Sequence, residues 1–326
     1  MALPNFLCVG AVKAGTSWLH ENLSHHPGVW MPPMKESQFF NHRFVEADRV
    51  WTTDSVMTAI QAAMVRYVRL HAKTGIDPVY IRYLFKMATR DLFSEAWYRE
   101  IFDWRGATGK LLGEVTPGYS QLGADGIAYL TKLLGDVRII YIIRDPVGRA
   151  MSQLRMRATR MKNLPGTIEE WQAWASMPEV ESRGDYAQFI PLWQAAVPAN
   201  RLLFLPYGDI ASDPSGFLRR VEDFLGIAPF DKYPWIDKQV HYGKRFALPV
   251  AVKDFLAERL QPQLQFVETT FGADFANRIK RPPPPTLVEP AEPVSTDRPL
   301  HVQSVAPNLA VAPNLALQAN KMAVGA

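Results

Sequence analysis

Short apolar runs alternate along this chain with longer segments in which apolar residues recur every three or four positions. The short runs have the length of strands, and the longer segments have the period of helices. Because strands that alternate with helices form parallel sheets, the pattern predicts an α/β fold with a P-loop-like parallel β-sheet and helices on both faces. The predicted strands are Phe6–Val9, Lys110–Val115, Arg138–Ile143 and Arg201–Leu205.

The stretch from about 45 to 98 interrupts this alternation with a helical pattern and few strand signals. It predicts a helical insertion after the first βα unit, in a place that can carry acceptor recognition. Later helices are predicted at Tyr186–Trp193, from Pro214 to a capping Gly226, and as one closing helix over Ala251–Phe271.

The composition changes abruptly after Arg281. Four successive prolines, Pro282 to Pro285, precede a stretch rich in Pro, Ala, Val and Asn that contains the hexapeptide VAPNLA twice. Such a sequence buries too little apolar surface to fold. We therefore predict a domain at 1–281, which is long enough for a large core, and a disordered tail at 282–326 with no catalytic role.

Charge and cysteine content narrow the functional classes. The formal net charge of +4 comes without a long Lys/Arg run, which gives little support to a nucleic-acid partner. Cys8 is the single cysteine, so no internal disulfide can form, which favours a reducing compartment. We see neither a signal peptide nor the ~18–20 apolar residues of a membrane span, and expect a cytoplasmic protein.

The first candidate site is the loop between the first strand and the following helix. Gly10 and Gly15 bracket it, Lys13 lies within it, and Thr16-Ser17 open the helix. Helix N–H groups, the helix dipole and the lysine together favour a bound phosphate-like anion. A Walker A loop has its lysine directly after the second glycine, where this chain has Thr16, and this argues against a nucleotide triphosphatase. An ordinary glycine turn is the alternative interpretation.

The second candidate site is Arg144-Asp145-Pro146, with Ser152 on the helix that follows. Arg144 leaves the carboxyl end of the strongest predicted strand, where open α/β sheets bind ligands. The guanidinium and the Ser152 hydroxyl could hold one phosphate together. The alternative interpretation is a salt bridge that only caps the helix.

The third candidate is Glu36, which follows Lys35 and precedes Phe39 and Phe40. A carboxylate beside apolar rings loses solvation and becomes more basic, which suits a general base. An exposed surface glutamate is the default interpretation.

Taken together, these motifs resemble the sulfotransferases that use 3′-phosphoadenosine 5′-phosphosulfate (PAPS), in the branch of the heparan-sulfate N- and 3-O-sulfotransferases and their bacterial relatives. The resemblance spans about 5 to 275. Lys13–Ser17 is similar to the 5′-phosphosulfate loop, and Arg144 with Ser152 to the 3′-phosphate pair. Further similar segments are Lys35–Asn41, which carries the family's catalytic glutamate, Tyr98–Tyr119, Arg183–Tyr186 and the late basic loop Gly243–Arg245.

The resemblance implies an enzyme that transfers a sulfuryl group from PAPS, without a metal, to an acceptor that the sequence does not identify. It implies Glu36 as the base, with Glu114 as the next candidate, and Lys13 as the residue that stabilises the leaving group. The implied cofactor contacts are Lys13, Ala14, Gly15, Thr16, Ser17, Trp18, Arg144, Ser152, Tyr186, Lys244 and Arg245. The implied acceptor contacts are Lys35, Gln38, Phe39, Glu114 and Thr116.

One departure from the family pattern concerns the reaction centre. Many relatives have Glu-Lys-(Ser/Thr)-Pro where this chain has Glu114-Val115-Thr116-Pro117, so a lysine is missing. Two other functions stay open at this point: a P-loop kinase or nucleotidase, and a nucleotide-binding protein without catalysis. The position of Lys13 disfavours the first, and the presence of Glu36 and Lys13 disfavours the second.

Overall fold

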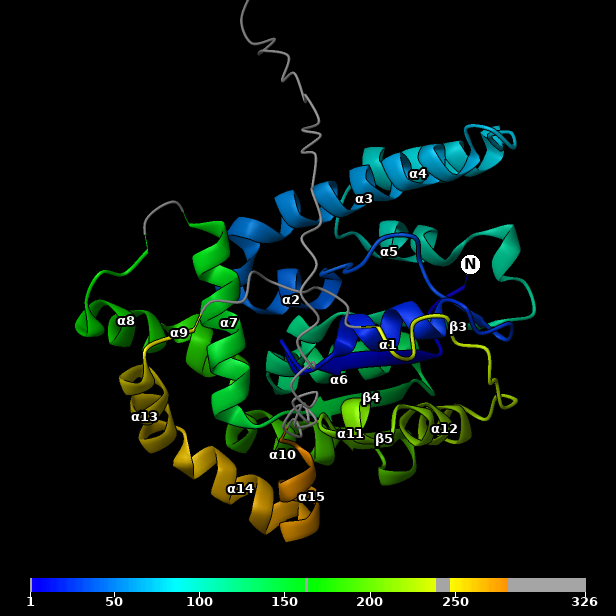
Figure 1. The fold of residues 1–326 in the computed structure, drawn as a ribbon. Coiled ribbons are helices and arrows are strands. Elements are labelled where there is room, and N and C mark those ends of the chain that lie inside the picture. The colour runs from blue at the N-terminus through cyan, green and yellow to red at the C-terminus, as the bar shows by residue number, and fades with distance from the viewer. Residues whose placement is uncertain (1, 162–163, 239–246, 281–326) are drawn as a thin grey trace, which may run out of the picture. The chain divides into compact units, whose positions relative to one another are not determined.

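Five parallel strands form the sheet at the centre of the protein, in the order β2-β3-β1-β4-β5 (Figure 1). The computed structural model describes residues 2–161, 164–238 and 247–280. The strands are β1 (Phe6–Gly10), β2 (Val29–Trp30), β3 (Leu111–Val115), β4 (Arg138–Ile143) and β5 (Leu202–Pro206).

The central strand β1 is completely buried and pairs with β3 on one side and β4 on the other. Phe6 aligns with Gly113 in β3 and with Arg138 in β4. A Cβ atom at Gly113 would lie 2.1 Å from the Phe6 ring, so only glycine fits there. The register brings the carboxyl ends of β1 and β4 side by side, and these ends precede Lys13 and Arg144.

The predicted α/β fold with a parallel sheet is confirmed. Each of the four predicted strands occurs within one or two residues of its expected bounds. The edge strand β2 was not predicted, because its two residues are too few to show a period.

Helices flank the sheet (Figure 1). They are α1 (Thr16–Leu23), α2 (Phe39–Phe44), α3 (Arg49–His71), α4 (Pro78–Thr89), α5 (Glu95–Phe102), α6 (Ala124–Leu134), α7 (Pro146–Arg160), α8 (Ile168–Ala175), α9 (Pro178–Glu181), α10 (Tyr186–Ala196), α11 (Asp209–Ser212), α12 (Pro214–Leu225), α13 (Val250–Arg259), α14 (Gln261–Phe271) and α15 (Ala273–Arg278). Short 3-10 helices lie at Glu46–Asp48, Arg105–Ala107, Pro117–Gln121, Ser182–Gly184 and Ala199–Arg201.

The closing helix predicted over Ala251–Phe271 is wrong as a single element. The chain forms α13 and α14 with a break at Leu260. Pro262 lies in the first turn of α14, where its missing N–H costs nothing, whereas inside a continuous helix its ring would clash with an earlier carbonyl. The predicted cap of α12 is confirmed, since Gly226 has the left-handed φ of 66°.

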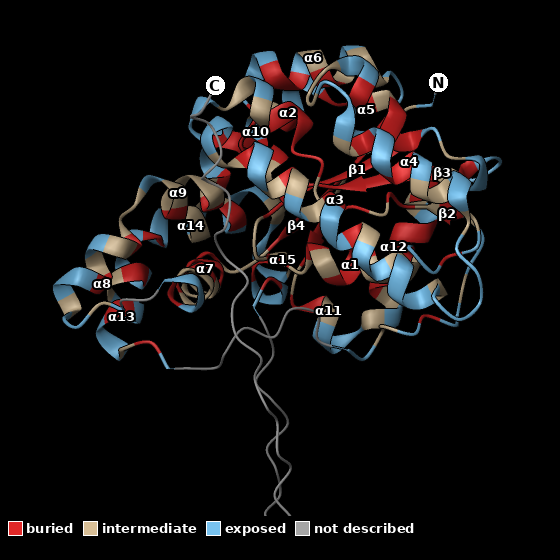
Figure 2. Cartoon of the chain, turned by 90° about the horizontal axis from the view of Figure 1, so that it is seen from above, coloured by how far each residue is buried: buried red, intermediate tan, exposed pale blue. Residues whose placement is uncertain are grey.

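Two apolar cores support this arrangement. The larger is built on the sheet strands, most of whose residues are buried (Figure 2). The smaller joins α7 to α8 and α13 through Leu154, Trp171 and Leu256. This smaller core packs α7, which begins just after β4, against α8 and α13.

Among the helices that the structure describes, none has the length and apolar content that a membrane crossing requires. The tail predicted at 282–326 lies outside the described residues.

Candidate active site

The loop after β1 presents the N-terminus of α1. Gly15 is the N-cap residue of α1, with a left-handed φ of 82°, and supplies no side chain to the first turn. The first N–H groups of a helix have no partner within it, so they are available to an anion. The left-handed φ favours glycine, and a Cβ atom at Gly15 would also lie 2.4 Å from Cδ1 of Ile210 in α11.

Lys13 is half-buried in this loop, with its Nζ atom 3.7 Å from Sδ of Met156. Burial lowers the pKa of Lys13 to about 8, and the positive charges of Arg144, Arg160 and Lys35 contribute to that fall, against the opposing charge of Glu36. Like charges that gather in this way raise one another's energy. A bound anion would relieve that repulsion.

Arg144 follows β4 and is attached to the Lys13 loop. Its Nη1 atom donates a hydrogen bond to the Lys13 carbonyl at 2.6 Å, and its guanidinium lies 4.4 Å from the centre of the Tyr207 ring. The Tyr186 hydroxyl donates to the Arg144 carbonyl at 2.9 Å. The structure therefore joins the first two predicted sites into one.

Ser152 lies half-buried on α7, one turn before Met156. Residues four apart on a helix share a face, so Ser152 is on the face of α7 that reaches Lys13 through Met156. Asp145 caps the same helix by accepting a hydrogen bond from the Gly148 N–H at 2.7 Å. Asp145 thus has the capping role of the alternative interpretation, which leaves the ligand role of Arg144 open.

Glu36 has polar neighbours. Its carboxylate is 2.9 Å from Nζ of Lys35 and accepts a hydrogen bond from Nε2 of Gln38 at 2.7 Å, and its side chain is 27% exposed. Phe39 and Phe40 are fully buried and pack on Tyr98, at ring-centre distances of 4.3 and 5.4 Å. The polar contacts of Glu36 are therefore with a cation and an amide.

Glu114, the second candidate base, lies in a closed network. Four hydroxyl groups donate to its carboxylate at 2.5–2.7 Å, from Ser37, Tyr98, Thr116 and Tyr119. Burial raises the pKa of Glu114, and these hydrogen bonds oppose the rise. Glu114 and Thr116 are both buried, so this arrangement favours a structural role for them over contact with an acceptor.

The side chains of Trp18 and Tyr186, two of the predicted cofactor contacts, form hydrogen bonds within the protein. The Trp18 ring is buried against Phe217, and its Nε1–H donates to the Ile236 carbonyl at 3.1 Å. Tyr186 is fully buried at the backbone of Arg144, and burial raises its pKa to about 12. Lys244 and Arg245, in the late basic loop, lie outside the described residues.

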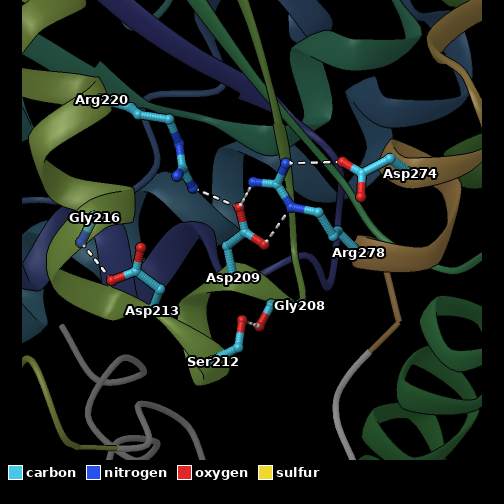
Figure 3. A network of polar contacts seen from close by, with 8 residues as sticks. All are labelled: Gly208, Asp209, Ser212, Asp213, Gly216, Arg220, Asp274 and Arg278. Atoms are coloured by element: carbon cyan, nitrogen blue, oxygen red, sulfur yellow. Dashed lines mark hydrogen bonds and ion pairs between the residues drawn. The ribbon is translucent and has the colours of Figure 1, made fainter.

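Residues that the sequence did not suggest stabilise the loops that carry the site. Tyr207 and Asp209 follow β5, and Asp209 accepts from Nη2 of Arg220 at 2.5 Å and from Nε and Nη2 of Arg278 at 3.1 and 2.5 Å (Figure 3). The Gly208 N–H donates to the Arg278 carbonyl at 2.8 Å, and the Asp145 N–H to the Ile279 carbonyl at 3.1 Å. The end of α15 therefore holds the two loops that carry Arg144 and Tyr207.

The donors of this site suit a ligand with negative charge at more than one point. The N-terminus of α1 and Lys13 lie in one loop, the Arg144 guanidinium is bonded to that loop, and Ser152 lies on the face of α7 that reaches Lys13. Within the described ranges, no three His, Cys, Asp or Glu side chains are grouped as a metal site.

Comparison with known proteins gives a consistent picture. A family profile described as "Sulfotransferase family" matches residues 4–232. Heparan sulfate glucosamine 3-O-sulfotransferase 3B1 of Mus musculus is 28% identical over 170 residues, which are 48% of this chain and 40% of that protein. Heparan sulfate glucosamine 3-O-sulfotransferase 6 of Homo sapiens is 26% identical over 179 residues, which are 51% of this chain and 48% of that protein. The chain thus spans less than half the length of these curated relatives.

Two solved structures share the fold. A sulfotransferase from Alicyclobacillus acidocaldarius superposes with a TM-score of 0.56 at 22% identity, over 82% of this chain and 96% of that one. The sulfotransferase STF9 from Mycobacterium avium superposes with a TM-score of 0.51 at 16% identity, over 83% of this chain and 78% of that one.

Proposed function

The chain belongs to the sulfotransferase family, and we propose that it uses PAPS to sulfate a hydroxyl or amine of an acceptor. The membership confirms the resemblance that the motifs indicated. The family implies the donor, while the acceptor and the roles of individual residues are our inference from the site.

The observation that carries the proposal is the surplus of positive charge around Lys13. Arg144, Arg160 and Lys35 all act on its ammonium, and Glu36 is the acid that opposes them. PAPS carries a phosphosulfate on the 5′ oxygen of its ribose and a phosphate on the 3′ oxygen. The α1 N-terminus with Lys13 suits the first group, and Arg144 with Ser152 suits the second.

In the proposed reaction, Glu36 removes the proton from the acceptor as the acceptor oxygen or nitrogen forms its bond to sulfur. The bond between sulfur and the 5′-phosphate oxygen breaks, and Lys13 and the N–H groups at the start of α1 stabilise the negative charge that this oxygen gains. One such donor typically lowers the barrier by about 3 kcal/mol. Arg144 and Ser152 hold the 3′-phosphate and act on binding more than on the chemical step.

A kinase on the same fold receives less support. Thr16 stands where a P-loop kinase has the lysine that reaches the β- and γ-phosphates. Lys13 instead lies in the loop, with its carbonyl bonded to Arg144 at 2.6 Å. This contact places Lys13 next to Arg144, the residue proposed to bind the 3′-phosphate that PAPS has and ATP lacks.

The proposal is tested by incubating the protein with ³⁵S-labelled PAPS and fractionated cell extracts, and identifying the labelled product by mass. We expect label to move to an organic acceptor and adenosine 3′,5′-bisphosphate to be released in equal amount. A parallel reaction with γ-³²P-ATP serves as the control. Transfer of ³²P without transfer of ³⁵S would contradict the proposal.

A further inference from the structure

The helices α3 and α4 and the loop between them, residues 49–89, form a hairpin that we call the α3–α4 hairpin (Figure 1). It carries most of the large apolar side chains that are strongly exposed in the described parts of the chain. Seven of ten belong to it: Val50, Val65, Val68, Leu70, Ile76, Val79 and Phe85, against Met161, Leu164 and Val250 elsewhere. Single exposed apolar residues are common, but such a concentration marks an interaction surface.

The exposed side chains of α3 include one on the side away from the core and one past the packed part of the helix. The buried residues of α3, among them Val56 and Ile60, follow a helical spacing that places Val65 on the opposite side, whereas Leu70 continues that spacing beyond the last buried residue, near the end of α3. The two helices are held together by Tyr67 and Tyr80, whose ring centres are 4.3 Å apart. Val65 is 51% exposed and Leu70 68%, so both present apolar surface to the solvent although the packing of α3 is supplied by other residues.

A shallow groove of about 540 Å³ runs along the exposed surface of α3. Ala62, Val65 and Leu70 form its apolar lining, and Arg66 and Arg69 flank it. Guanidinium groups beside an apolar groove suit an amphiphile with a negatively charged head.

The hairpin is also basic. Residues 49–89 contain six cationic side chains and two acids: Arg49, Arg66, Arg69, Lys73, Arg82 and Lys86 against Asp54 and Asp77. Lys86 and Arg90 are partly neutralised by Glu100 of α5, at 3.1 and 3.4 Å. Positive charge therefore remains on the part of the hairpin that includes Arg69 and Lys73.

We propose that the α3–α4 hairpin docks on an anionic lipid bilayer. Exposed valine and leucine side chains enter the boundary between headgroups and acyl chains, while Arg69 and Lys73 meet the lipid phosphates. A second copy of this chain would cover the apolar residues, but it would place the same positive charges against one another. Charge complementarity thus favours the lipid surface.

The hairpin is connected to the proposed reaction centre. Arg66 donates from Nη2 to the Pro33 carbonyl at 2.5 Å, two residues before Lys35 and three before Glu36. Docking would therefore bring the loop that carries Glu36 toward the membrane surface. That the acceptor is itself a lipid or another membrane-bound amphiphile rests on the proposed function, whereas the docking does not.

The test is sedimentation of the whole protein with vesicles, without PAPS. Vesicles of phosphatidylcholine mixed with phosphatidylglycerol are compared with vesicles of pure phosphatidylcholine. We expect binding to the mixed vesicles alone, weakening as salt is added, because each surface Lys or Arg contributes about fivefold to the partition coefficient. Val65→Ser combined with Leu70→Ser should lower the partition coefficient about tenfold. Arg69→Gln combined with Lys73→Gln should lower it about 25-fold and leave the remaining binding less sensitive to salt.

Val250→Ser, at a 74% exposed position on α13, is the matched control and should bind as the parent does. Equal binding to both kinds of vesicle, no binding, or an equal loss in Val250→Ser would overturn the docking. So would a dimer in solution that Val65→Ser dissociates. If docking holds but no labelled sulfate enters a lipid extract, only the lipid acceptor fails. If no acceptor of any class takes up label, the proposed function fails and docking stands.

Discussion

The molecule contains two polar clusters that differ in how the protein itself balances their charge. In one, a single carboxylate, Glu114, is buried and receives four hydroxyl donors. In the other, Lys13 lies among Arg144, Arg160 and Lys35, with Glu36 as the opposing acid. The first cluster is satisfied by the protein's own hydroxyl groups, whereas three cations and one acid act on Lys13 in the second. A buried, satisfied network stabilises a fold, whereas a half-buried surplus of positive charge favours the binding of an anion.

The largest effect is expected when Glu36 is replaced. If Glu36 takes the acceptor proton, Glu36→Gln should lower turnover about 100-fold, the usual contribution of a general base. Affinity for adenosine 3′,5′-bisphosphate, measured by calorimetry, should stay within about twofold, because the substituted amide keeps one oxygen and nearly the same shape while losing the charge.

Glu46→Gln is the matched control, because Glu46 is exposed on a 3-10 helix and should keep full turnover. Unchanged turnover in Glu36→Gln would move the base elsewhere in the chain. Glu114 would then be the next candidate despite its burial.

The next expected effect is at Lys13. Lys13→Met should lower turnover by about 100-fold through loss of one donor to the leaving oxygen. Burial lowers the pKa of Lys13 to about 8, so in the parent protein the ammonium loses its proton as the pH rises through that value. Affinity for the bisphosphate should therefore fall above pH 8 in the parent and stay level in Lys13→Met. Lys132→Met, at an exposed position, provides the control, and the same pH dependence in the parent and in Lys13→Met would contradict the assignment.

The third prediction concerns the buried hydrogen-bond network around Glu114. In the parent protein, four hydroxyl groups donate hydrogen bonds to the Glu114 carboxylate. Glu114→Gln replaces one acceptor oxygen with an N–H donor, so at least one of these buried hydrogen bonds is lost. We expect the free energy of unfolding to fall by about 1–3 kcal/mol, measured by denaturant titration. The Michaelis constant for PAPS should not change in the protein that remains folded. A variant of full stability that has lost turnover would show that Glu114 acts in the reaction.

A smaller effect is expected at Asp209, for which Asp213 provides a comparison; Figure 3 shows both carboxylates. Asp209→Asn weakens the contacts to Arg220 and Arg278 that hold the loop of Tyr207, and should raise the Michaelis constant for PAPS about fivefold, equivalent to about 1 kcal/mol, with kcat unchanged. Asp213→Ala removes the cap of α12, whose Asp213 accepts from the Gly216 N–H at 2.8 Å, and should lower stability by about 1 kcal/mol without changing that constant. Equal Michaelis constants in both variants would show that Asp209 does not position the site.

The sequence predicted the parts of this account that depend on local pattern. The run Arg138–Ile143 and the loop from Gly10 to Ser17 show their strand, turn and helix start in neighbouring residues, and the structure places them as expected. The support of the site depends instead on distant side chains. Asp209 and Arg278 are 69 residues apart, and Glu114 gathers hydroxyl groups from three separate segments. No local pattern marks such partners, because tertiary packing alone brings them together.

Trp18 and Glu36 also have side-chain contacts that their sequence motifs do not indicate. Their positions in the sequence suggested a cofactor contact for Trp18 and apolar surroundings for Glu36. The structure adds partners that the sequence did not indicate: the Trp18 ring Nε1–H donates to the Ile236 carbonyl, and Lys35 and Gln38 contact the Glu36 carboxylate. A motif indicates which segment meets the ligand, but the direction of each side chain is decided by what packs around it.

We infer that the cluster around Lys13 has two anion-binding groups that match a 3′-phosphorylated nucleotide. Calorimetry tests it most directly, with adenosine 3′,5′-bisphosphate, adenosine 5′-phosphate and Mg·ATP titrated into the parent protein and into Arg144→Ala. In the parent, the bisphosphate should bind more than about 100-fold more tightly than adenosine 5′-phosphate, since a guanidinium–phosphate contact contributes about 3 kcal/mol. Arg144→Ala should remove most of that preference. Tight binding of Mg·ATP together with no preference for the bisphosphate would contradict the account.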